Sequence, residues 1–274
     1  MRAIERSAGR TALLAAFVFA AMPAPGVAQD NTKKEIEKYQ KMLAEGSPVE
    51  LWELEGEGLW KKSQGPKKAS LERCDLGLGA GVVKGAYARM PRYFKDTDQV
   101  QDLESRLLTC MTTLQGRSLE EASKRLFGST ETPSEMEYVV SYVVGQSRGH
   151  KMAVSTAHPK EKEAFELGKK VFFFRAGNWD FSCASCHGEK DKRIRMQDLP
   201  ILSEPSGARP AYTSWPAYRV SNSQMKTMQW RLWDCYRQMR FPEPKFGSEA
   251  TVALTMFMAV TANGAPYRGP GTKR

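Results

Sequence analysis

The residues with the most distinctive chemistry are Cys183, Cys186 and His187, which form a C-x-x-C-H sequence. Thiols at this spacing can add to the two vinyl groups of haem as thioethers, and the adjacent imidazole can bind the iron axially. A zinc site or a thioredoxin-like dithiol is the alternative. A zinc site needs a closed set of four ligands, which only Cys235 and two distant histidines could complete. A thioredoxin-like dithiol is expected within a βαβ pattern, and none surrounds these cysteines. The motif therefore predicts a covalently bound haem c.

Cys235 is a candidate for the second axial position of the iron. Methionine is the usual sixth ligand in an electron carrier, and the methionines that follow the motif are Met196, Met225, Met228, Met239, Met256 and Met258. Most of them fit a buried helical stripe, whereas Cys235 has a counterpart, Cys110, in an internal repeat. An inert buried cysteine remains the simpler interpretation of this thiol.

Arg231 precedes Cys235 by four residues, which places both on one face of a helix. Its charge would hold a thiolate ionised and could bind an anionic substrate. Arg219, Arg237 and Lys226 are further candidates, each explained equally well as a solvated charge. Thiolate ligation lowers the reduction potential of the iron, so this sulfur suits nucleophilic sulfur transfer better than electron shuttling.

The N-terminus has the pattern of a secretory signal. Three arginines within the first ten residues precede an apolar stretch over 13–21 and a small-residue cleavage site at 26–28. The apolar stretch is too short to span a bilayer, with an uncleaved anchor as the alternative. We expect export to the periplasm and a mature chain that begins near Gln29.

The chain is basic before and after this processing. Its net charge of +10 falls to +8 once the signal segment is removed, because 38 basic and 30 acidic residues remain. Such a surface could attract small anions or an acidic protein. Nucleic acid is a poor candidate partner for an exported protein.

The sequence repeats itself at an offset of 125 residues. The residues that coincide after this shift are Pro91 with Pro216, Tyr93 with Tyr218, Gln99 with Gln224, Arg106 with Arg231, Leu107 with Leu232 and Cys110 with Cys235. Apolar residues recur at helical spacing over 100–114 and 225–239. The pattern predicts one amphipathic helix in each half, the second running from near Ser223 to before Pro242.

Other periodic segments complete a helical plan. The helices expected besides these two lie at 50–60, from a capping sequence at 132–135 to Gly149, at 159–174, and from after Ser248 to Gly264. In the capping sequence we place Pro133 at the first helical position. We therefore predict an all-α fold of two tandem cytochrome c-like domains related by internal duplication.

The cysteine pattern indicates that the first half lacks haem. Cys74 lies where a first haem cysteine would be, but Gly77 and Leu78 replace the second cysteine and the histidine. Cys74 and Cys110 can then close a disulfide in an oxidising compartment, the alternative being two buried free thiols. By elimination Cys235 is unpaired.

These assignments define the expected organisation of the chain. The predicted parts are a signal peptide at 1–28, a polar helix at 29–47, a haem-free cytochrome c-like domain at 48–150 and a haem-binding domain at 151–274.

Taken together, the degenerate first half, the C-x-x-C-H motif and the segment Arg231-Leu-Trp-Asp-Cys235-Tyr236 resemble SoxA, the catalytic subunit of the SoxAX cytochrome of bacterial thiosulfate oxidation. The resemblance implies Cys183 and Cys186 as thioether anchors and His187 as the proximal ligand. It implies Cys235 as the distal ligand and persulfide-bearing catalytic residue, with Arg231 as the substrate-binding cation.

Gly77 and Leu78 depart from family members that carry two haems on this subunit. The resemblance is therefore to the monohaem type, with one haem c per chain and a disulfide in the first half.

The resemblance also implies a reaction and partners. Thiosulfate would be joined oxidatively to a cysteine of the carrier SoxYZ, and a small c-type cytochrome, SoxX, would form a heterodimer with this chain and take the electrons. A methionine-ligated periplasmic electron carrier is the competing interpretation. A haem-bearing structural subunit whose partner performs the catalysis is another.

Overall fold

The computed structural model describes residues 48–123, 126, 132–194 and 197–273, together with single residues between 34 and 46. The expected signal peptide at 1–28 lies outside the described residues, as does most of the polar helix expected at 29–47. Residues 42–274 form one compact unit. Among the residues that the structure describes, no helix has the length and apolar character needed to cross a membrane.

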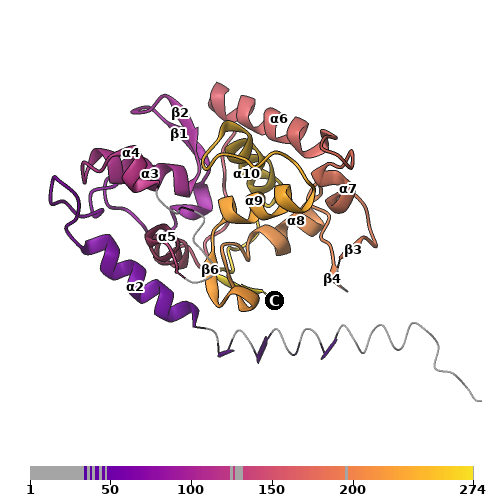
Figure 1. Cartoon of the computed structure of the whole chain (residues 1–274), viewed down its shortest axis with the longest axis horizontal. Coiled ribbons are helices and arrows are strands. Elements are labelled where there is room, and N and C mark those ends of the chain that lie inside the picture. The colour runs from indigo at the N-terminus through magenta and orange to yellow at the C-terminus, as the bar shows by residue number, and fades with distance from the viewer. Residues whose placement is uncertain are drawn as a thin grey trace, which may run out of the picture. The chain divides into compact units, whose positions relative to one another are not determined.

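Helices make up most of the regular structure (Figure 1). In chain order they are α2 (Val49–Lys61), the 3₁₀ turn η1 (Tyr87–Arg89), α3 (Leu103–Thr113), α4 (Leu119–Ala122), α5 (Glu135–Gly145), α6 (Pro159–Phe173), α7 (Cys183–His187), α8 (Pro205–Tyr212), the 3₁₀ turn η2 (Val220–Asn222), α9 (Met228–Gln238) and α10 (Glu249–Thr261). The strands are β1 (Arg92–Phe94), β2 (Gln99–Gln101), β3 (Arg193–Ile194), β4 (Gln197–Asp198), β5 (Ala217–Arg219), β6 (Gln224–Lys226) and β7 (Gly271–Lys273).

Two helix pairs, α2 with α5 and α6 with α10, pack at very close range. A Cβ atom added to Gly56 would lie 2.0 Å from the Tyr138 carbonyl oxygen, and one added to Gly168 would lie 1.9 Å from that of Ala253. Only glycine allows the two backbones of each pair to approach this closely. Each pair contains the helix that begins a half of the chain and the last long helix of the same half.

Local sequence sets most helix boundaries, but the last long helix of the first half differs from expectation at both ends, and it ends at Gly145 instead of Gly149. The last long helix of the first half is capped by Ser134, whose hydroxyl accepts from the Glu137 amide while the Glu137 carboxylate accepts from the Ser134 amide. The capping box therefore starts two residues later than expected, and Pro133 lies before the cap instead of inside the helix. The start of α10 after Ser248 is confirmed, and Ser248 accepts from the Thr251 amide.

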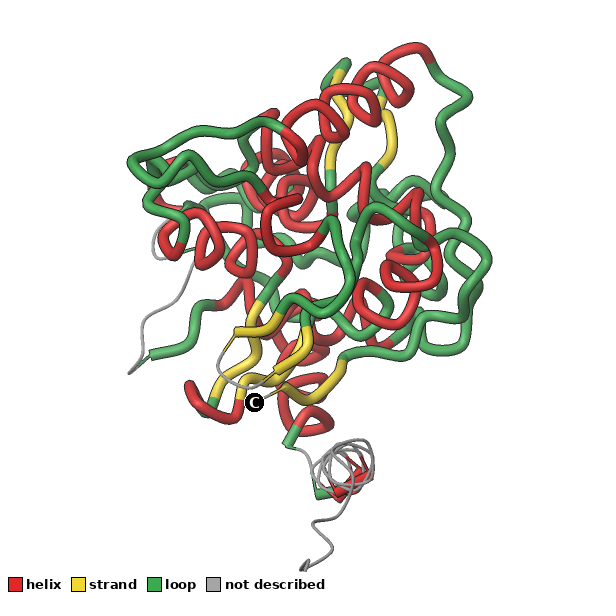
Figure 2. Tube along the Cα trace, turned by 90° about the vertical axis from the view of Figure 1, so that its right-hand side faces the viewer, coloured by secondary structure: helices red, strands yellow, loops and turns green. Residues whose placement is uncertain are grey.

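The all-α prediction is wrong in detail, because small β-sheets precede the two amphipathic helices. In the second half β6 occupies the segment expected to begin the helix, Ser223 adopts a left-handed conformation with φ of 53°, and the helix starts at Met228 with Thr227 as its cap. Three-residue strands are too short for hydrophobic periodicity to reveal. Antiparallel pairing of β5 with β6 and parallel pairing of β5 with β7 form a three-stranded sheet next to the C-terminal end (Figure 2).

The first half has an equivalent hairpin at the same offset as the sequence repeat. Arg92 pairs with Gln101 in β1 and β2, and Ala217 pairs with Lys226 in β5 and β6. A cis peptide bond precedes the proline at the start of each hairpin, at Met90-Pro91 and Trp215-Pro216. The two hairpins thus hold the following helices, α3 and α9, in corresponding places.

One buried core is continuous across both halves. Its members include Leu71, Leu107, Val143, Phe172, Met228 and Leu254. Buried polar contacts also join the halves. The Lys226 ammonium lies 2.7 Å from the Glu137 carboxylate, and the backbone N–H of Gln229 donates to the Glu104 carboxyl group. Such buried polar groups fix the position of the two halves relative to each other, because moving one partner would leave the other buried and unpaired, which costs free energy.

Candidate functional site

The C-x-x-C-H sequence forms the short helix α7. Ser182 caps it, since the hydroxyl of Ser182 accepts from the Ser185 amide and the Ser185 hydroxyl accepts from the Ser182 amide. This cap makes residues 183–187 one helical turn, so Cys183 and Cys186 lie on the same face. Both thiols are partly exposed and free. They are presented together at one side of the helix, as two thioether links to one ligand require.

His187 is oriented for ligation through its outer nitrogen. Its Nδ1 lies 2.9 Å from the Pro200 carbonyl oxygen, and because that oxygen can only accept, Nδ1 carries the proton and the Nε2 lone pair is left for a metal. Burial lowers the pKa of His187, the Pro200 carbonyl opposes this, and the positive charge of Arg231 lowers it further. The imidazole is therefore held neutral, which is the form that binds iron.

Cys235 lies on α9 and faces the haem motif. The pKa of the Cys183 thiol is raised to about 12, chiefly by burial and then by the charges of Cys235 and Cys186. The charge of Cys186 also acts on Cys235. The charges of these thiols act on one another, which indicates that Cys235 of α9 lies near Cys183 and Cys186 of α7.

The ionisation of Cys235 differs from expectation. Burial raises the pKa of its thiol, and although the charges of Arg231 and Arg219 lower it, those of Asp234 and Cys186 raise it further. The expectation that the charge of Arg231 would hold a thiolate ionised is therefore wrong for the protein alone, because desolvation of the charged form outweighs this partly exposed cation. A thiol bound to a metal loses its proton outright, so ligation to iron would supply what the arginine does not.

Arg231 is held in place by Asp234. One carboxylate oxygen of Asp234 lies 3.0 Å from the Arg231 guanidinium and the other lies 2.7 Å from that of Arg237. The Arg231 guanidinium also lies 5.8 Å from the ring centre of Trp215. Of the other basic candidates, Lys226 is buried in the ion pair between the halves and does not belong to the site.

These residues fit a haem c. Two thiols on one turn, an imidazole with its outer nitrogen available and a thiol from a second helix provide the anchors and axial donors that an iron porphyrin needs. The described residues contain no cluster of three or more His, Cys, Asp or Glu side chains able to hold a metal ion by themselves.

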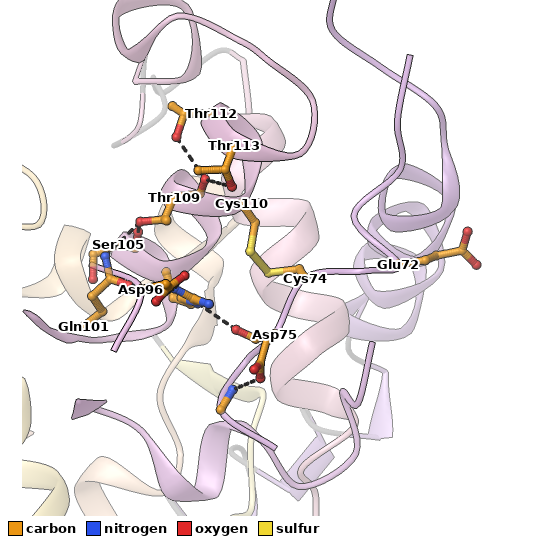
Figure 3. The surroundings of a disulfide bond; sticks show 12 residues. Glu72, Cys74, Asp75, Asp96, Gln101, Ser105, Thr109, Cys110, Thr112 and Thr113 are labelled. Carbon is orange, nitrogen blue, oxygen red and sulfur yellow. Dashed lines mark hydrogen bonds and ion pairs between the residues drawn. A yellow bond between two sulfur atoms is a disulfide. The ribbon is translucent and has the colours of Figure 1, made fainter. Parts of the chain in front are cut away.

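The corresponding place in the first half carries a disulfide instead of a haem motif. Cys74 and Cys110 form a disulfide, as predicted, between a loop and α3 (Figure 3). Gly77, at the position of a second haem cysteine, has φ of 92°, and a Cβ there would lie 2.4 Å from the Arg92 side chain, which donates to the Gly77 carbonyl. In the second half the residue equivalent to Arg92 is Ala217, which has a much smaller side chain.

All five residues expected at the site, Cys183, Cys186, His187, Arg231 and Cys235, are brought together by α7 and α9. Sequence reasoning missed Pro200 and Asp234. Pro200 acts through its backbone carbonyl, which no sequence pattern marks. Asp234 had a signal, since its separation of three residues from Arg231 and from Arg237 places it beside both on a helix.

Comparison with known proteins agrees with this geometry. The family model of the SoxA/TsdA cytochrome c domain matches residues 55–152. The L-cysteine S-thiosulfotransferase subunit SoxA of Hydrogenophilus thermoluteolus is 50% identical over 99% of this chain and 100% of its own length. The SoxA subunit of Hydrogenobacter thermophilus is 35% identical over 90% of this chain and 91% of its own.

A solved structure shares the fold. The crystal structure of SoxXA from P. pantotrophus superposes with a TM-score of 0.70 at 25% identity, covering 86% of this chain and 84% of that one. Sequence identity over nearly the whole chain, a matching domain and a matching fold point to one conclusion: the chain belongs to the SoxA family.

Proposed function

We propose that this protein is an L-cysteine S-thiosulfotransferase that joins thiosulfate oxidatively to a cysteine of a carrier protein of the SoxYZ type. The observation that carries the proposal is the placement of Cys235 opposite α7, with Arg231 beside it on the same helix. Membership of the SoxA family supports it, because the relatives bear the name of this activity.

One haem c per chain is proposed, attached through Cys183 and Cys186 with His187 and Cys235 as axial ligands. When bound, the haem supplies an iron that takes nitrogen and sulfur ligands and can exchange an electron. The Pro200 carbonyl holds His187 in the required tautomer. The first half supports a count of one, because Cys74 is cross-linked to Cys110 and because Gly77 and Leu78 stand where the second cysteine and the histidine would be.

The chemistry is nucleophilic at sulfur. The Cys235 thiolate would form a sulfur–sulfur bond with the outer sulfur of thiosulfate, and the pair would lose two electrons, one to each of two c-type haems that act as acceptors. The carrier thiolate then attacks that outer sulfur, the new carrier sulfur–sulfur bond replaces the bond to Cys235, and Cys235 leaves as a thiolate. Arg231 neutralises the sulfonate throughout, held in position by Asp234.

A SoxX-like c-type cytochrome is the proposed partner subunit and electron acceptor, which the SoxXA structure of P. pantotrophus supports. We also propose a periplasmic location after removal of residues 1–28. The disulfide inside the chain supports this location, because disulfides persist in an oxidising compartment such as the periplasm.

Internal duplication is proposed for the two cytochrome c-like domains at 48–150 and 151–274. It is supported by the identical register of the two hairpins, by the cis proline that begins each, and by the glycine contact within each helix pair. Short strands accompany the helices of both domains, so the proposed domains are mainly helical.

The test compares Cys235→Ala with Met239→Leu, which removes a sulfur side chain four residues further along α9. Each haem-loaded variant, complexed with the c-type partner, is mixed with thiosulfate and carrier, and conjugate is followed by intact mass while acceptor reduction is followed by absorbance. We expect Cys235→Ala to lose the distal-ligand spectrum and all conjugate formation, with Met239→Leu unchanged.

The opposite pattern would establish a methionine-ligated electron carrier and overturn the proposal. A structural role without catalysis predicts that Cys235 never acquires additional sulfur, which intact mass of protein from thiosulfate-exposed cells reports directly.

A further inference from the structure

Two basic side chains meet on the sheet that precedes α9. Parallel pairing of β5 with β7 sets Arg219 directly opposite Lys273, near the end of the chain. Residues paired across neighbouring strands project to the same face of the sheet, with their Cβ atoms about 5 Å apart. The C-terminal strand therefore adds a lysine beside Arg219.

Arg231 approaches this pair from α9. Its guanidinium lies 5.8 Å from the ring of Trp215, two residues before β5 begins. The pKa of Lys273 is lowered to about 8, first by burial and then by the positive charges of Arg268, Arg219 and Arg231. Arg231 also shares one face of α9 with Cys235, four residues further along the helix. Several cations thus lie close to one another and to the proposed reactive sulfur.

The first half lacks this concentration of charge, although it keeps the arginine. Arg106, the counterpart of Arg231, binds both oxygens of Asp96 at 2.9 and 2.8 Å and lies 4.0 Å from the ring centre of Phe94. At the offset of 125 residues, Phe94 corresponds to Arg219 and Asp96 to Ser221. The haem-binding half therefore has a second cation where the first half has an aromatic ring, and Arg231 takes its carboxylate partner from Asp234 on α9 instead of from the hairpin.

We propose that Arg219 and Lys273 join Arg231 in binding the sulfonate end of thiosulfate beside Cys235. This inference rests on the proposed function and extends it, since it assigns residues to the substrate. Like charges held together in a partly buried site repel one another, and an anion with several acceptor oxygens relieves that repulsion when it binds. The site therefore favours a compact, doubly charged oxyanion over a neutral thiol.

The test replaces each cation by a neutral residue of similar length in the haem-loaded complex. Lys273→Gln and Arg219→Gln are each expected to raise the KM for thiosulfate about tenfold or more, as loss of one charge-assisted contact does, with kcat changed much less. Lys273→Arg keeps the charge and should restore a KM near that of the wild type. Lys95→Gln, on the hairpin of the first half, makes the same change in net charge and should leave KM unaltered.

Two direct readouts accompany the kinetics. Calorimetric titration with thiosulfate should show weakened binding in the two glutamine variants while the haem spectrum stays as in the wild type. A crystal structure of the wild-type complex soaked in thiosulfate should place sulfonate oxygens within hydrogen-bond distance of Lys273 and Arg219, and this readout requires no variant to fold.

An unchanged KM and affinity in both glutamine variants, or a bound anion that touches neither side chain, would overturn the inference. If the wild type forms conjugate in those experiments, the proposed function stands without this subsite. If the wild type forms none, the function itself fails, so the two outcomes are distinguishable.

Discussion

The disulfide of the haem-free half allows a stability effect to be worked out from the structure. Cys74 and Cys110 are separated by 36 residues, and both are almost completely buried. Constraint of a loop of this length in the unfolded chain is worth about 4 kcal/mol in the chain-entropy treatment. The double variant Cys74→Ala/Cys110→Ala should lose at least that much free energy of unfolding, which corresponds to roughly 8–16 °C in Tm for a chain of this size.

The assay is urea unfolding of the haem-loaded protein, followed by circular dichroism, with thermal unfolding in parallel. Dithiothreitol reduces a disulfide but not a haem thioether, so reduced wild type should match the double variant. Cys74→Ala alone should lose about as much, because either change removes the cross-link. A double variant within about 1 kcal/mol of the oxidised wild type would refute the reasoning, since the cross-link would then constrain little.

The other predictions concern a helix contact and a buried acid. Gly56→Ala should destabilise the protein by about 1–3 kcal/mol, because its Cβ would meet the facing backbone of α5. Gly58→Ala, in the same helix but with open space around it, should stabilise the protein by about 0.5–1 kcal/mol. Equal effects of the two substitutions on the free energy of unfolding in urea would contradict the close packing of α2 against α5. Burial and a neighbouring carboxylate raise the pKa of Glu104 from 4.5 to about 8. The contribution of neutral Glu104 to the free energy of unfolding is therefore complete below pH 4.5, and it is lost as pH rises towards 8, by at most about 1.4 kcal/mol per pH unit. Glu104→Gln removes this dependence, and its unfolding free energy relative to wild type should rise between pH 5 and pH 8; a constant difference would show that Glu104 is ionised in the folded protein.

Chemistry carried by neighbouring residues was predictable from the sequence. The spacing of Cys183, Cys186 and His187 predicts haem attachment, because thioether formation with the two haem vinyl groups requires that spacing. The count of the remaining cysteines predicted the Cys74–Cys110 pair. Long helices were also predictable, since their apolar faces repeat every three to four residues. The start of α10 at Ser248 followed from a side chain that acts within one turn.

Short strands and long-range partners were not predictable in this way. The hairpins before α3 and α9 contain three residues per strand, too few for any periodicity, and only their pairing identifies them. The Pro200 carbonyl that orients His187 comes from another loop, and backbone groups carry no mark in the sequence. Lys273 meets Arg219 through strand pairing alone.

The sequence by itself determined which atoms are available for haem attachment, sulfur chemistry and the cross-link, because identity and local spacing are covalent properties. Only the tertiary structure decided how those atoms behave. Arg231 suggested an ionised Cys235, yet burial outweighs that charge, since desolvation depends on every element packed around the thiol. The charge that gathers on one face of a sheet likewise exists only once distant segments have met.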